Sequence, residues 1–154
     1  MGATLIRTKA YCLIAKDGLI LLTEDERSPG WKLPGGGLKK GEGVCQGLLR
    51  ELMEEVNLTV KPTWLVQIQE YKNKKEKHTL RFYFTGDWQA GEIKLAIGEV
   101  KKAKWFSRQE LAALTEADFW YLPYYEAVQA YLKNERYPLQ LLKQLNINRE
   151  EDEI

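Results

Sequence analysis

LPGGGLKKGEGVCQGLLRELMEEVNL, residues 33–58, places three consecutive glycines directly before a run with helical periodicity. At about 100° per residue, one arc of this helix carries the apolar side chains of Cys45, Leu48, Leu49, Leu52 and Val56. Three carboxylates, Glu51, Glu54 and Glu55, fall together on a neighbouring arc. The pattern predicts a helix over residues 43–56 with one face in the core and an acidic face beside it.

The acidic face is unfavourable for an isolated helix. Like charges three or four residues apart destabilise a helix by roughly 0.2–0.5 kcal/mol per pair. Glu54 and Glu55 also lie in the last turn, where the helix dipole disfavours anions. A solvated acidic surface is one interpretation. The other is a metal site, because clustered carboxylate oxygens suit Mg²⁺ or Mn²⁺ and a bound cation would remove the repulsion.

The glycine loop favours the metal interpretation. Gly35, Gly36 and Gly37 carry no Cβ, so the backbone can adopt positive φ and come close to a ligand. Lys39 and Lys40 follow, and the start of the helix offers free N–H donors. Most glycine-rich loops are simple turns. Beside an acidic helix, however, this one predicts a phosphate group held between backbone donors and divalent cations.

Length and composition are those of an ordinary globular domain. The chain has 154 residues and a net charge of +1, which argues against a general binder of nucleic acids or membrane surfaces. Cys12 and Cys45 lack disulfide or metal-binding spacing and are expected to be reduced core residues. Arg7 and Lys9 interrupt the apolar N-terminal stretch, so we expect no signal peptide, no membrane span and a cytoplasmic location.

Strands and helices alternate along the rest of the chain. Strands are expected at residues 8–14, 19–23, 31–33, 63–71, 79–84 and 100–106, with a hairpin turn at 16–18. Helices are expected at residues 107–114, 123–133 and 138–145, the first with a capping box formed by Ser107 and Glu110. We expect one α/β (α+β) domain over residues 1–148, followed by an acidic, frayed tail at 149–154.

Residues 36–58 resemble the signature of the Nudix hydrolase family, G-x5-E-x7-R-E-U-x-E-E-x-G-U, where U is a bulky aliphatic residue. Gly36 opens the pattern and Glu42 supplies its first acid. The later fixed positions are matched by Arg50, Glu51, Leu52, Glu54, Glu55 and Leu58. Asn57 occupies the last glycine position and is the single departure. A left-handed helix cap is the expected role there, and asparagine tolerates that conformation.

The resemblance implies an α/β/α sandwich around a mixed sheet, and cleavage of a pyrophosphate in a nucleoside diphosphate linked to another group. It implies Mg²⁺ or Mn²⁺ held by Glu54, Glu55 and a backbone carbonyl at Gly35 or Gly36, with Glu51 as a further ligand or as a carboxylate that binds a water. Arg50 would orient these carboxylates through charge-assisted hydrogen bonds, or form an ordinary surface ion pair. Glu42 would brace the site without touching the metal.

Two glutamates compete as catalytic base. Glu51 lies on the acidic face, whereas Glu99 lies six residues before Trp105, in a loop where family members often carry a functional glutamate. Alternatively, Glu99 is an ordinary solvent-exposed glutamate of this loop with no role in catalysis. His78 is the only histidine and is expected to be an ordinary residue at a strand end. The carboxylates are therefore the main acid–base resource, and the implied catalytic set is Arg50, Glu51, Glu54 and Glu99.

The substrate is less determined by the sequence. We expect Gly35, Gly36, Gly37, Lys39 and Trp31 to contact it. Trp31 resembles the MutT-type layout for nucleoside triphosphates, although a tryptophan there could equally pack against the loop. Nucleoside or deoxynucleoside triphosphates are favoured slightly over ADP-ribose and nucleotide sugars. Five aromatic residues could stack on a base or pack in the core: Tyr71, Tyr83, Phe119, Trp120 and Tyr121. The lysines of residues 72–77 could steer polyphosphates or form a solvated hairpin tip.

Two classes of function remain. The favoured one is a divalent-metal-dependent nucleotide pyrophosphohydrolase. The alternative is a Nudix-like nucleotide-binding or regulatory module that does not hydrolyse, and the intact acidic face argues against it. The expected partner is a small-molecule nucleotide, with no specific nucleic-acid partner and no membrane, and a homodimer is left open.

Overall fold

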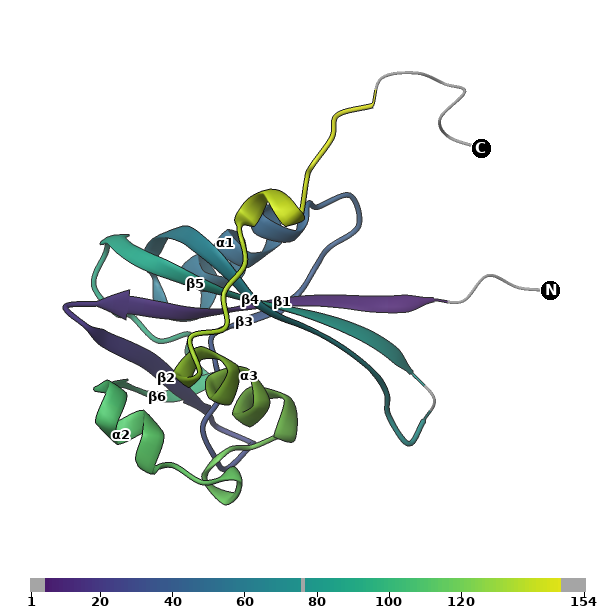
Figure 1. The fold of residues 1–154 in the computed structure, drawn as a ribbon. Helices are drawn as coiled ribbons and strands as arrows, with labels where there is room; N and C mark the ends of the chain where they lie inside the picture. Colours follow the sequence, from purple (N-terminus) through teal and green to yellow (C-terminus); the bar gives the residue numbers. More distant parts are fainter. Residues whose placement is uncertain (1–4, 76, 148–154) are drawn as a thin grey trace.

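A computed structural model describes residues 5–75 and 77–147 of the chain. Figure 1 shows a central sheet with helices on both sides. In chain order, the strands and helices are β1 (Ile6–Lys16), β2 (Leu19–Asp25), β3 (Gly35–Gly37), α1 (Val44–Val56), β4 (Thr59–Lys72), β5 (His78–Ala90), β6 (Val100–Phe106), α2 (Arg108–Ala113) and α3 (Leu122–Leu132). Two short 3₁₀ turns, η1 (Glu116–Asp118) and η2 (Leu139–Leu141), complete the described elements.

The sheet is mixed. Its order is β4-β5-β1-β2-β6, and β3 pairs with the first half of β1. β1 and β5 run parallel, whereas the other neighbours are antiparallel. The predicted hairpin turn between β1 and β2 is confirmed: Asp17 (φ 52°) and Gly18 (φ 78°) both have the positive φ that a tight two-residue turn requires.

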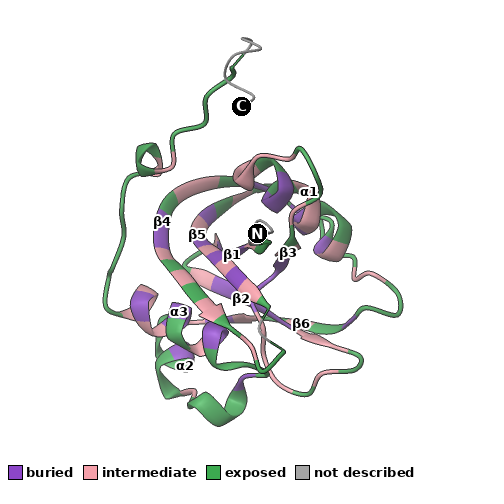
Figure 2. Ribbon diagram, turned by 90° about the vertical axis from the view of Figure 1, so that its right-hand side faces the viewer, coloured by how far each residue is buried: buried purple, intermediate pink, exposed green. Residues whose placement is uncertain are grey.

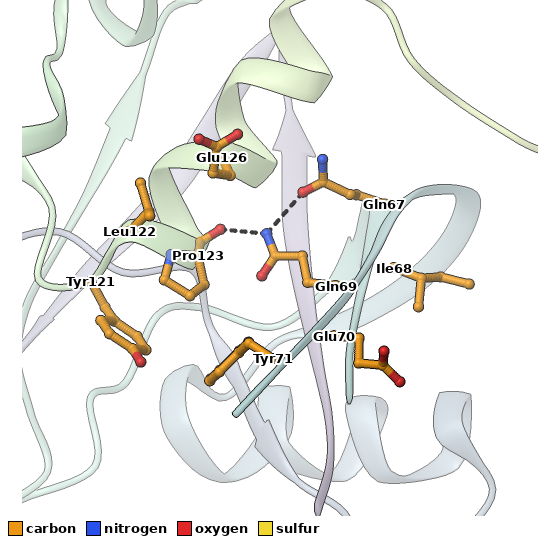
Figure 3. Close-up of a pocket in the computed structure, with 9 residues that line it drawn as sticks. All are labelled: Gln67, Ile68, Gln69, Glu70, Tyr71, Tyr121, Leu122, Pro123 and Glu126. Atoms are coloured by element: carbon orange, nitrogen blue, oxygen red, sulfur yellow. Dashed lines mark hydrogen bonds between the residues drawn. The ribbon is translucent and has the colours of Figure 1, made fainter. Parts of the chain in front are cut away.

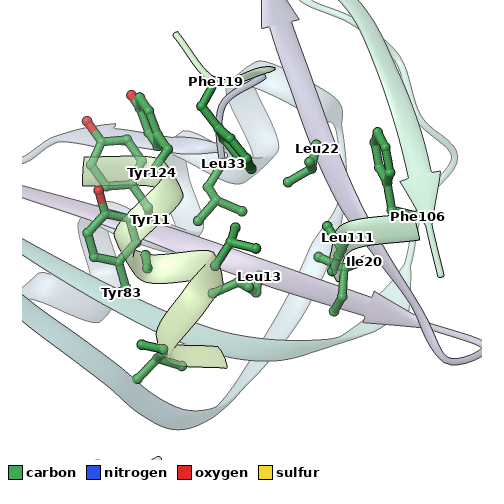
Figure 4. Close-up of a cluster of buried hydrophobic side chains, with 14 residues drawn as sticks. Tyr11, Leu13, Ile20, Leu22, Leu33, Tyr83, Phe106, Leu111, Phe119 and Tyr124 are labelled. Atoms are coloured by element: carbon green, nitrogen blue, oxygen red, sulfur yellow. The ribbon is translucent and has the colours of Figure 1, made fainter. Parts of the chain in front are cut away.

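Two buried layers lie on opposite faces of the sheet, which confirms the predicted α/β/α sandwich. β1 shows the division, because alternate side chains along a strand point to opposite faces. Tyr11 and Leu13 belong to the core layer under α2 and α3, shown in Figure 4. Ala10, Cys12 and Ile14 belong to the layer under α1. β1 is therefore buried on both faces. In Figure 2, buried residues gather on the strands and exposed residues on the outer loops.

Helix α1 matches the predicted helix closely. Leu48, Leu52 and Val56 are fully buried, so its apolar arc is the face against the sheet. Leu49 differs from the expectation: it lies at the edge of the arc and is 39% exposed. Asn57 ends the helix in the left-handed conformation, φ 62° and ψ 34°, which is the cap expected from the signature.

Residues 138–145 do not form the predicted helix. Only the turn η2 forms there, because the chain before it is held extended along the edge of the sheet. The amide of Leu65 donates to the carbonyl of Tyr137 (2.9 Å), and the amide of Tyr137 donates to the carbonyl of Leu65 (2.7 Å). Pro138 continues with extended ψ of 142°. These tertiary hydrogen bonds override the local helical pattern.

The strand near the glycine loop lies later than predicted. Trp31 and Lys32 form only isolated bridges, to Phe119 and Thr23. The strand forms instead at β3, where the glycines let the backbone pair with β1. The expected tail at 149–154 lies outside the described residues. In the described part of the chain, no helix has both the length and the apolar character needed to cross a bilayer.

Candidate active site

The glycine strand β3 is locked against both the sheet and helix α1. Gly35 (φ 143°) pairs with Tyr11, and a Cβ at Gly35 would lie 2.1 Å from the carbonyl oxygen of Ala10. Its amide donates a 3.1 Å hydrogen bond to Oε2 of Glu55. Glycine is therefore required at this position, because any side chain would separate β3 from β1.

Gly36 lies directly against a carboxylate of the acidic face. A Cβ there would lie 2.8–2.9 Å from the carboxylate atoms of Glu51. The glycine thus allows the backbone to approach this carboxylate, and burial raises the pKa of Glu51 above its ordinary value. Gly37 has open space in that direction and faces solvent.

Arg50 connects the carboxylates to the loop. Its Nε and Nη2 donate to the two carboxylate oxygens of Glu42 at 2.7 and 2.9 Å, which makes a bidentate ion pair. Its Nη1 donates to Glu54 at 3.0 Å and to Glu51 at 3.3 Å, and its Nη2 also donates to the carbonyl of Gly37 at 3.1 Å. A planar guanidinium can make all these bonds at once, whereas an ammonium group cannot.

Glu42 is held by Arg50 and by the loop backbone. The amide of Lys39 donates to Oε1 of Glu42 at 2.6 Å. The hydrogen bonds from Arg50, followed by this backbone bond, lower the pKa of Glu42 to about 2. Glu42 therefore stays ionised at all ordinary pH values and fixes the position of Arg50.

Glu55, Glu99 and Asp25 share a cavity of about 490 Å³ at the end of α1. The loop that carries Glu99 is fixed to this helix end, because the amide of Ala96 donates to the carbonyl of Glu55 at 3.1 Å. Burial, together with the nearby charges of Glu51, Asp25 and Glu99, raises the pKa of Glu55 to about 8. The structure thus brings Glu99 to the acidic face, although 44 residues separate it from Glu55 in the sequence.

The donor chemistry of this cavity fits a hard divalent cation. Carboxylate oxygens are the ligands that Mg²⁺ and Mn²⁺ prefer, and a cation would remove the charge repulsion that Glu55 experiences. The predicted ligand cluster is nevertheless not assembled: among residues 5–75 and 77–147, no three acidic, histidine or cysteine side chains converge to hold one ion. Arg50 holds Glu51 and Glu54, while Glu55 is turned toward Gly35.

Lys39 and Trp31, both predicted to contact the substrate, lie in different surroundings. Lys39 is exposed beside Gly37 and lines a cavity at the glycine loop. Trp31 is half-buried and packs edge-on against Phe106, with ring centroids 5.0 Å apart. Trp31 therefore contributes to packing behind the loop, which is the alternative that the sequence left open.

The five candidate stacking residues lie in three different surroundings. Tyr83 and Phe119 are buried in the core layer under α3, and Trp120 is exposed. Tyr71 and Tyr121 line a cavity of about 420 Å³ between β4 and the start of α3, shown in Figure 3. Gln69 lies in this cavity, with its Nε2 donating to the carbonyl of Pro123 at 2.8 Å. Its Oε1 is buried and has no hydrogen-bond partner within the described chain.

His78 lies at the base of the β4–β5 hairpin, where its Nε2 is 3.1 Å from a carboxylate oxygen of Glu70. In the sheet, His78 pairs with Ile6 at the start of β1, before the residues of β1 that pair with the glycine strand. It therefore fits the predicted ordinary strand-end residue.

Sequence reasoning missed Asp25, Lys9 and Arg81. Asp25 is the last residue of β2 and forms an ion pair with Lys32. In the sequence, only the change from an apolar strand to polar residues indicated that Asp25 could belong to a site. Arg81 is 4% exposed and lies over the rings of Tyr11 and Tyr124, at 4.8 and 4.9 Å. Alternation along β1 and β5 could have placed Lys9 and Arg81 on one face, but only the strand register brings them side by side.

Comparison with known proteins identifies the family. Residues 5–128 match the model of the NUDIX domain, which is most of the chain. The chain belongs to the Nudix hydrolase family. A NUDIX hydrolase from Nitrosomonas europaea has a similar structure, with a TM-score of 0.76 and 28% identity over 92% of this chain and 98% of that one. The MutT NUDIX hydrolase from Burkholderia pseudomallei shares the Nudix fold at a TM-score of 0.67 and 23% identity, over 82% and 98% of the two chains.

Curated Nudix relatives differ in the activities that their names state. The human 8-oxo-dGDP phosphatase NUDT18 is 30% identical over 88% of this chain and 42% of its own length. The 8-oxo-dGTP diphosphatase of Buchnera aphidicola is 37% identical over 38% of this chain and 48% of its own length. Phosphatase NudJ of Escherichia coli is 22% identical over 88% of this chain and 89% of its own length. The chain thus spans less than half of the first two of these relatives.

Proposed function

We propose that this Nudix protein is a divalent-metal-dependent hydrolase that cleaves the pyrophosphate of a nucleoside diphosphate linked to another group. One observation carries the proposal: the Gly35 amide binds Glu55, while Arg50 ties Glu42, Glu51 and Glu54 to the carbonyl of Gly37. The glycine strand and four carboxylates are thus linked into one unit that can hold phosphate beside acidic side chains.

Glu51, Glu54 and Glu55 would hold Mg²⁺ or Mn²⁺, with a backbone carbonyl at Gly35 or Gly36. When bound, the cation would neutralise phosphate oxygens and stabilise the leaving phosphate. Arg50 keeps the carboxylates on the side of the loop, and Glu42 keeps Arg50 in place. To bind one cation together with Glu55, the side chains of Glu51 and Glu54 would have to turn away from Arg50.

Proton removal from the attacking water is assigned to a carboxylate, either Glu51 or Glu99. Glu51 contacts Gly36 and Arg50, so it serves the metal site and the chemistry together. Glu99 is exposed at the mouth of the cavity that Glu55 lines, so it can reach a water without being a ligand. A well-placed base of this kind contributes about 10²–10⁴-fold to the rate.

Nucleoside and deoxynucleoside triphosphates are the favoured substrates, followed by ADP-ribose and nucleotide sugars. One curated relative is named for 8-oxo-dGTP, a deoxynucleoside triphosphate, which supports the first group; another is named for the corresponding diphosphate, 8-oxo-dGDP. The nucleotide ring would enter the cavity of Figure 3, where Tyr71 and Tyr121 offer aromatic faces and the free Oε1 of Gln69 accepts a hydrogen bond.

The test is a hydrolysis assay, with substrate and products separated by chromatography, in Mg²⁺ and in Mn²⁺ over nucleoside triphosphates, oxidised deoxynucleoside triphosphates, ADP-ribose, nucleotide sugars and dinucleoside polyphosphates. Hydrolysis of at least one substrate, abolished by chelation of the metal, is the expected result. Glu135→Gln, which removes an exposed carboxylate outside the site, is the matched control for Glu54→Gln and Glu55→Gln. Tight nucleotide binding without turnover would instead identify a non-hydrolysing module.

A further inference from the structure

A row of polar side chains crosses the sheet directly beside the glycine strand. Gly37 on β3 pairs with Lys9 on β1, and Lys9 pairs with Arg81 on β5. Arg81 in turn pairs with Gln69 on β4. Paired residues of neighbouring strands point to the same face of a sheet. With strands about 4.8 Å apart, the backbone of Lys9 lies roughly 5 Å and that of Arg81 roughly 10 Å from Gly37.

This row lies on the face of the sheet that α3 covers. Tyr11, two residues after Lys9, belongs to the buried layer under α2 and α3. At the other end of the row, Nε2 of Gln69 donates to the carbonyl of Pro123, the second residue of α3, at 2.8 Å. Glu55 and the other carboxylates belong to α1, on the opposite face. The glycine strand therefore separates the acidic side chains from the two cations of the row.

No side chain of β3 blocks the way from the carboxylates to Lys9. All three residues of β3 are glycines, and a Cβ at Gly37 would meet nothing within 4 Å. Lys9 and Gly37 line one cavity of about 520 Å³, and Glu42 on its wall is already held by Arg50. Neighbouring phosphates of a nucleotide lie closer together than neighbouring strands. A phosphate beside β3 can therefore be followed by one beside Lys9.

Arg81 is a buried cation enclosed by tyrosines. It is 4% exposed. Its Nε donates to the hydroxyl of Tyr71 at 2.8 Å, and its Nη1 donates to the hydroxyl of Tyr83 at 3.1 Å. The rings of Tyr11 and Tyr124 lie on either side of the pair of strands, within 5 Å of the guanidinium carbon. Hydroxyl groups do not neutralise a charge, and a buried charge without an opposite charge is unfavourable.

These surroundings belong to the body of the sheet and not to the hairpin that joins β4 and β5. Lys9 and Arg81 each lie three residues, roughly 10 Å, beyond Ile6 and His78, where their strands begin at the hairpin end. The bond from Arg81 to Tyr83 carries the guanidinium further from that end.

Lys9 and Arg81 repel each other. Burial, followed by the charges of Arg81, Arg7 and Lys32, lowers the pKa of Lys9. Within residues 5–75 and 77–147, neither Lys9 nor Arg81 forms an ion pair. Nη2 of Arg81 makes no hydrogen bond there, and it is not fully enclosed, because Oε1 of Gln69 is the only fully buried side-chain atom without a partner in that part of the chain. An anion that contacts both cations would remove the repulsion.

We propose that Lys9 and Arg81 together bind the phosphate that carries the nucleoside. The inference rests on the proposed function and adds the direction in which the nucleotide lies. The pyrophosphate would cross the glycine strand from the carboxylates, and its nucleoside-side phosphate would contact Lys9 and Nη2 of Arg81 through charge-assisted hydrogen bonds. The base would then lie at the far end of the row, in the cavity of Figure 3 that Gln69 and Tyr71 line.

This phosphate stays on the nucleoside monophosphate that hydrolysis releases, so the site can be tested without metal or turnover. Isothermal titration calorimetry in EDTA, at fixed ionic strength, gives Kd for AMP and adenosine, and for dGMP and deoxyguanosine. Lys9→Gln is the test variant and Arg81→Gln the second one. Lys61→Gln is the control, because it removes the same charge from an exposed position near the start of β4.

The wild-type protein should bind at least one monophosphate about tenfold or more tightly than its nucleoside. Lys9→Gln should lose most of this difference, and Lys61→Gln should keep it. Without ligand, Lys9→Gln should be at least as stable as the wild type in thermal unfolding, because a repelling charge is gone. Weaker binding together with undiminished stability is not expected of a residue with a purely structural role. If Arg81→Gln does not fold, Lys9→Gln decides alone.

Three results would overturn the inference: no tighter binding of either monophosphate than of its nucleoside, unchanged affinity in Lys9→Gln, or an equal loss in Lys61→Gln. Cleavage of a nucleotide in the hydrolysis assay would still support the proposed function in each of these cases. Conversely, a protein that binds monophosphates through Lys9 but cleaves no nucleotide would refute the proposed function and keep the phosphate site.

Discussion

The backbone amide of Gly35 donates to the carboxylate of Glu55 at 3.1 Å and so joins the glycine strand to the last turn of α1. Glu55 also lines the cavity that it shares with Asp25 and Glu99. The position of the glycine strand and the position of the α1 carboxylates are therefore coupled. A substitution in one of them should also shift the other.

Glu55→Gln tests the charge of this residue separately from its hydrogen bond. A glutamine oxygen can still accept from Gly35, so the fold should survive. Loss of the charge should lower kcat by about 100-fold or more, because a proposed metal ligand is weakened. Removal of one repelling carboxylate should leave the metal-free protein at least as stable in thermal unfolding. Near wild-type turnover at saturating Mg²⁺ would show that Glu55 is not a ligand, and Glu135→Gln is the control.

Arg50→Lys keeps the positive charge but loses the planar fork. The two bonds to Glu42 and the bond to Gly37 cannot all be replaced by one ammonium group. We expect kcat to fall at least tenfold and the free energy of unfolding to fall by roughly 1–2 kcal/mol. Arg136→Lys, at an exposed position outside the site, serves as the control. An unchanged kcat would mean that Arg50 is an ordinary surface ion pair.

Glu42→Gln should alter how stability depends on pH. The pKa of Glu42 is lowered to about 2 in the folded protein, below the ordinary glutamate value near 4.3. Its contribution to stability is therefore fully present above about pH 5 and is lost as pH falls toward 2. In urea unfolding between pH 3 and pH 7, the midpoint difference between wild type and Glu42→Gln should be largest at neutral pH and shrink in acid. A constant difference would contradict the assignment.

Asn57→Gly tests the one departure from the family signature. Asn57 has φ of 62°, a conformation that glycine adopts without strain. The substitution loses one exposed hydrogen bond, from Nδ2 to the carbonyl of Glu92, so stability should change by less than about 1 kcal/mol. Activity should be unchanged in the same assay. A large loss of turnover would reveal a catalytic contribution of the asparagine side chain.

Local patterns in the sequence were sufficient to predict those parts of the site that lie on a single helix or strand. The periodicity of α1 placed Leu48 and Leu52 in the core and the three glutamates on the next face, and Asn57 at the cap. The capping box of Ser107 and Glu110 also formed as predicted, with bonds of 3.1 and 3.0 Å. These features depend on residues fewer than five positions apart, so their physics is local.

Features that depend on strand register could not be predicted from local patterns. Lys9, Arg81 and Gln69 are neighbours only because β1, β5 and β4 pair in one particular register. The helix predicted for residues 138–145 did not form, because Tyr137 directly before it pairs with Leu65, 72 residues earlier. Likewise, Arg50 draws Glu51 and Glu54 away from Glu55, an arrangement that helical spacing alone does not reveal.

The choice between Glu99 and Glu51 as catalytic base can be made with one titration. Glu51 contacts both Gly36 and Arg50, so Glu51→Gln should lower kcat and also raise the Mg²⁺ concentration needed for half-maximal rate. Glu99 is exposed on a loop at the rim of the cavity, and loss of a base that only removes a proton should cost about 10²–10⁴-fold at most.

We therefore expect Glu99→Gln to lower kcat at least tenfold with little change in the half-maximal Mg²⁺ concentration. Glu92→Gln, which changes an exposed glutamate in the same connection, controls for loop charge. The measurement is initial rate against Mg²⁺ concentration for each variant on the best substrate of the panel. If Glu99→Gln turns over like the wild type, Glu99 has no part in the mechanism. Glu51, or a water activated without any protein base, would then perform the proton transfer.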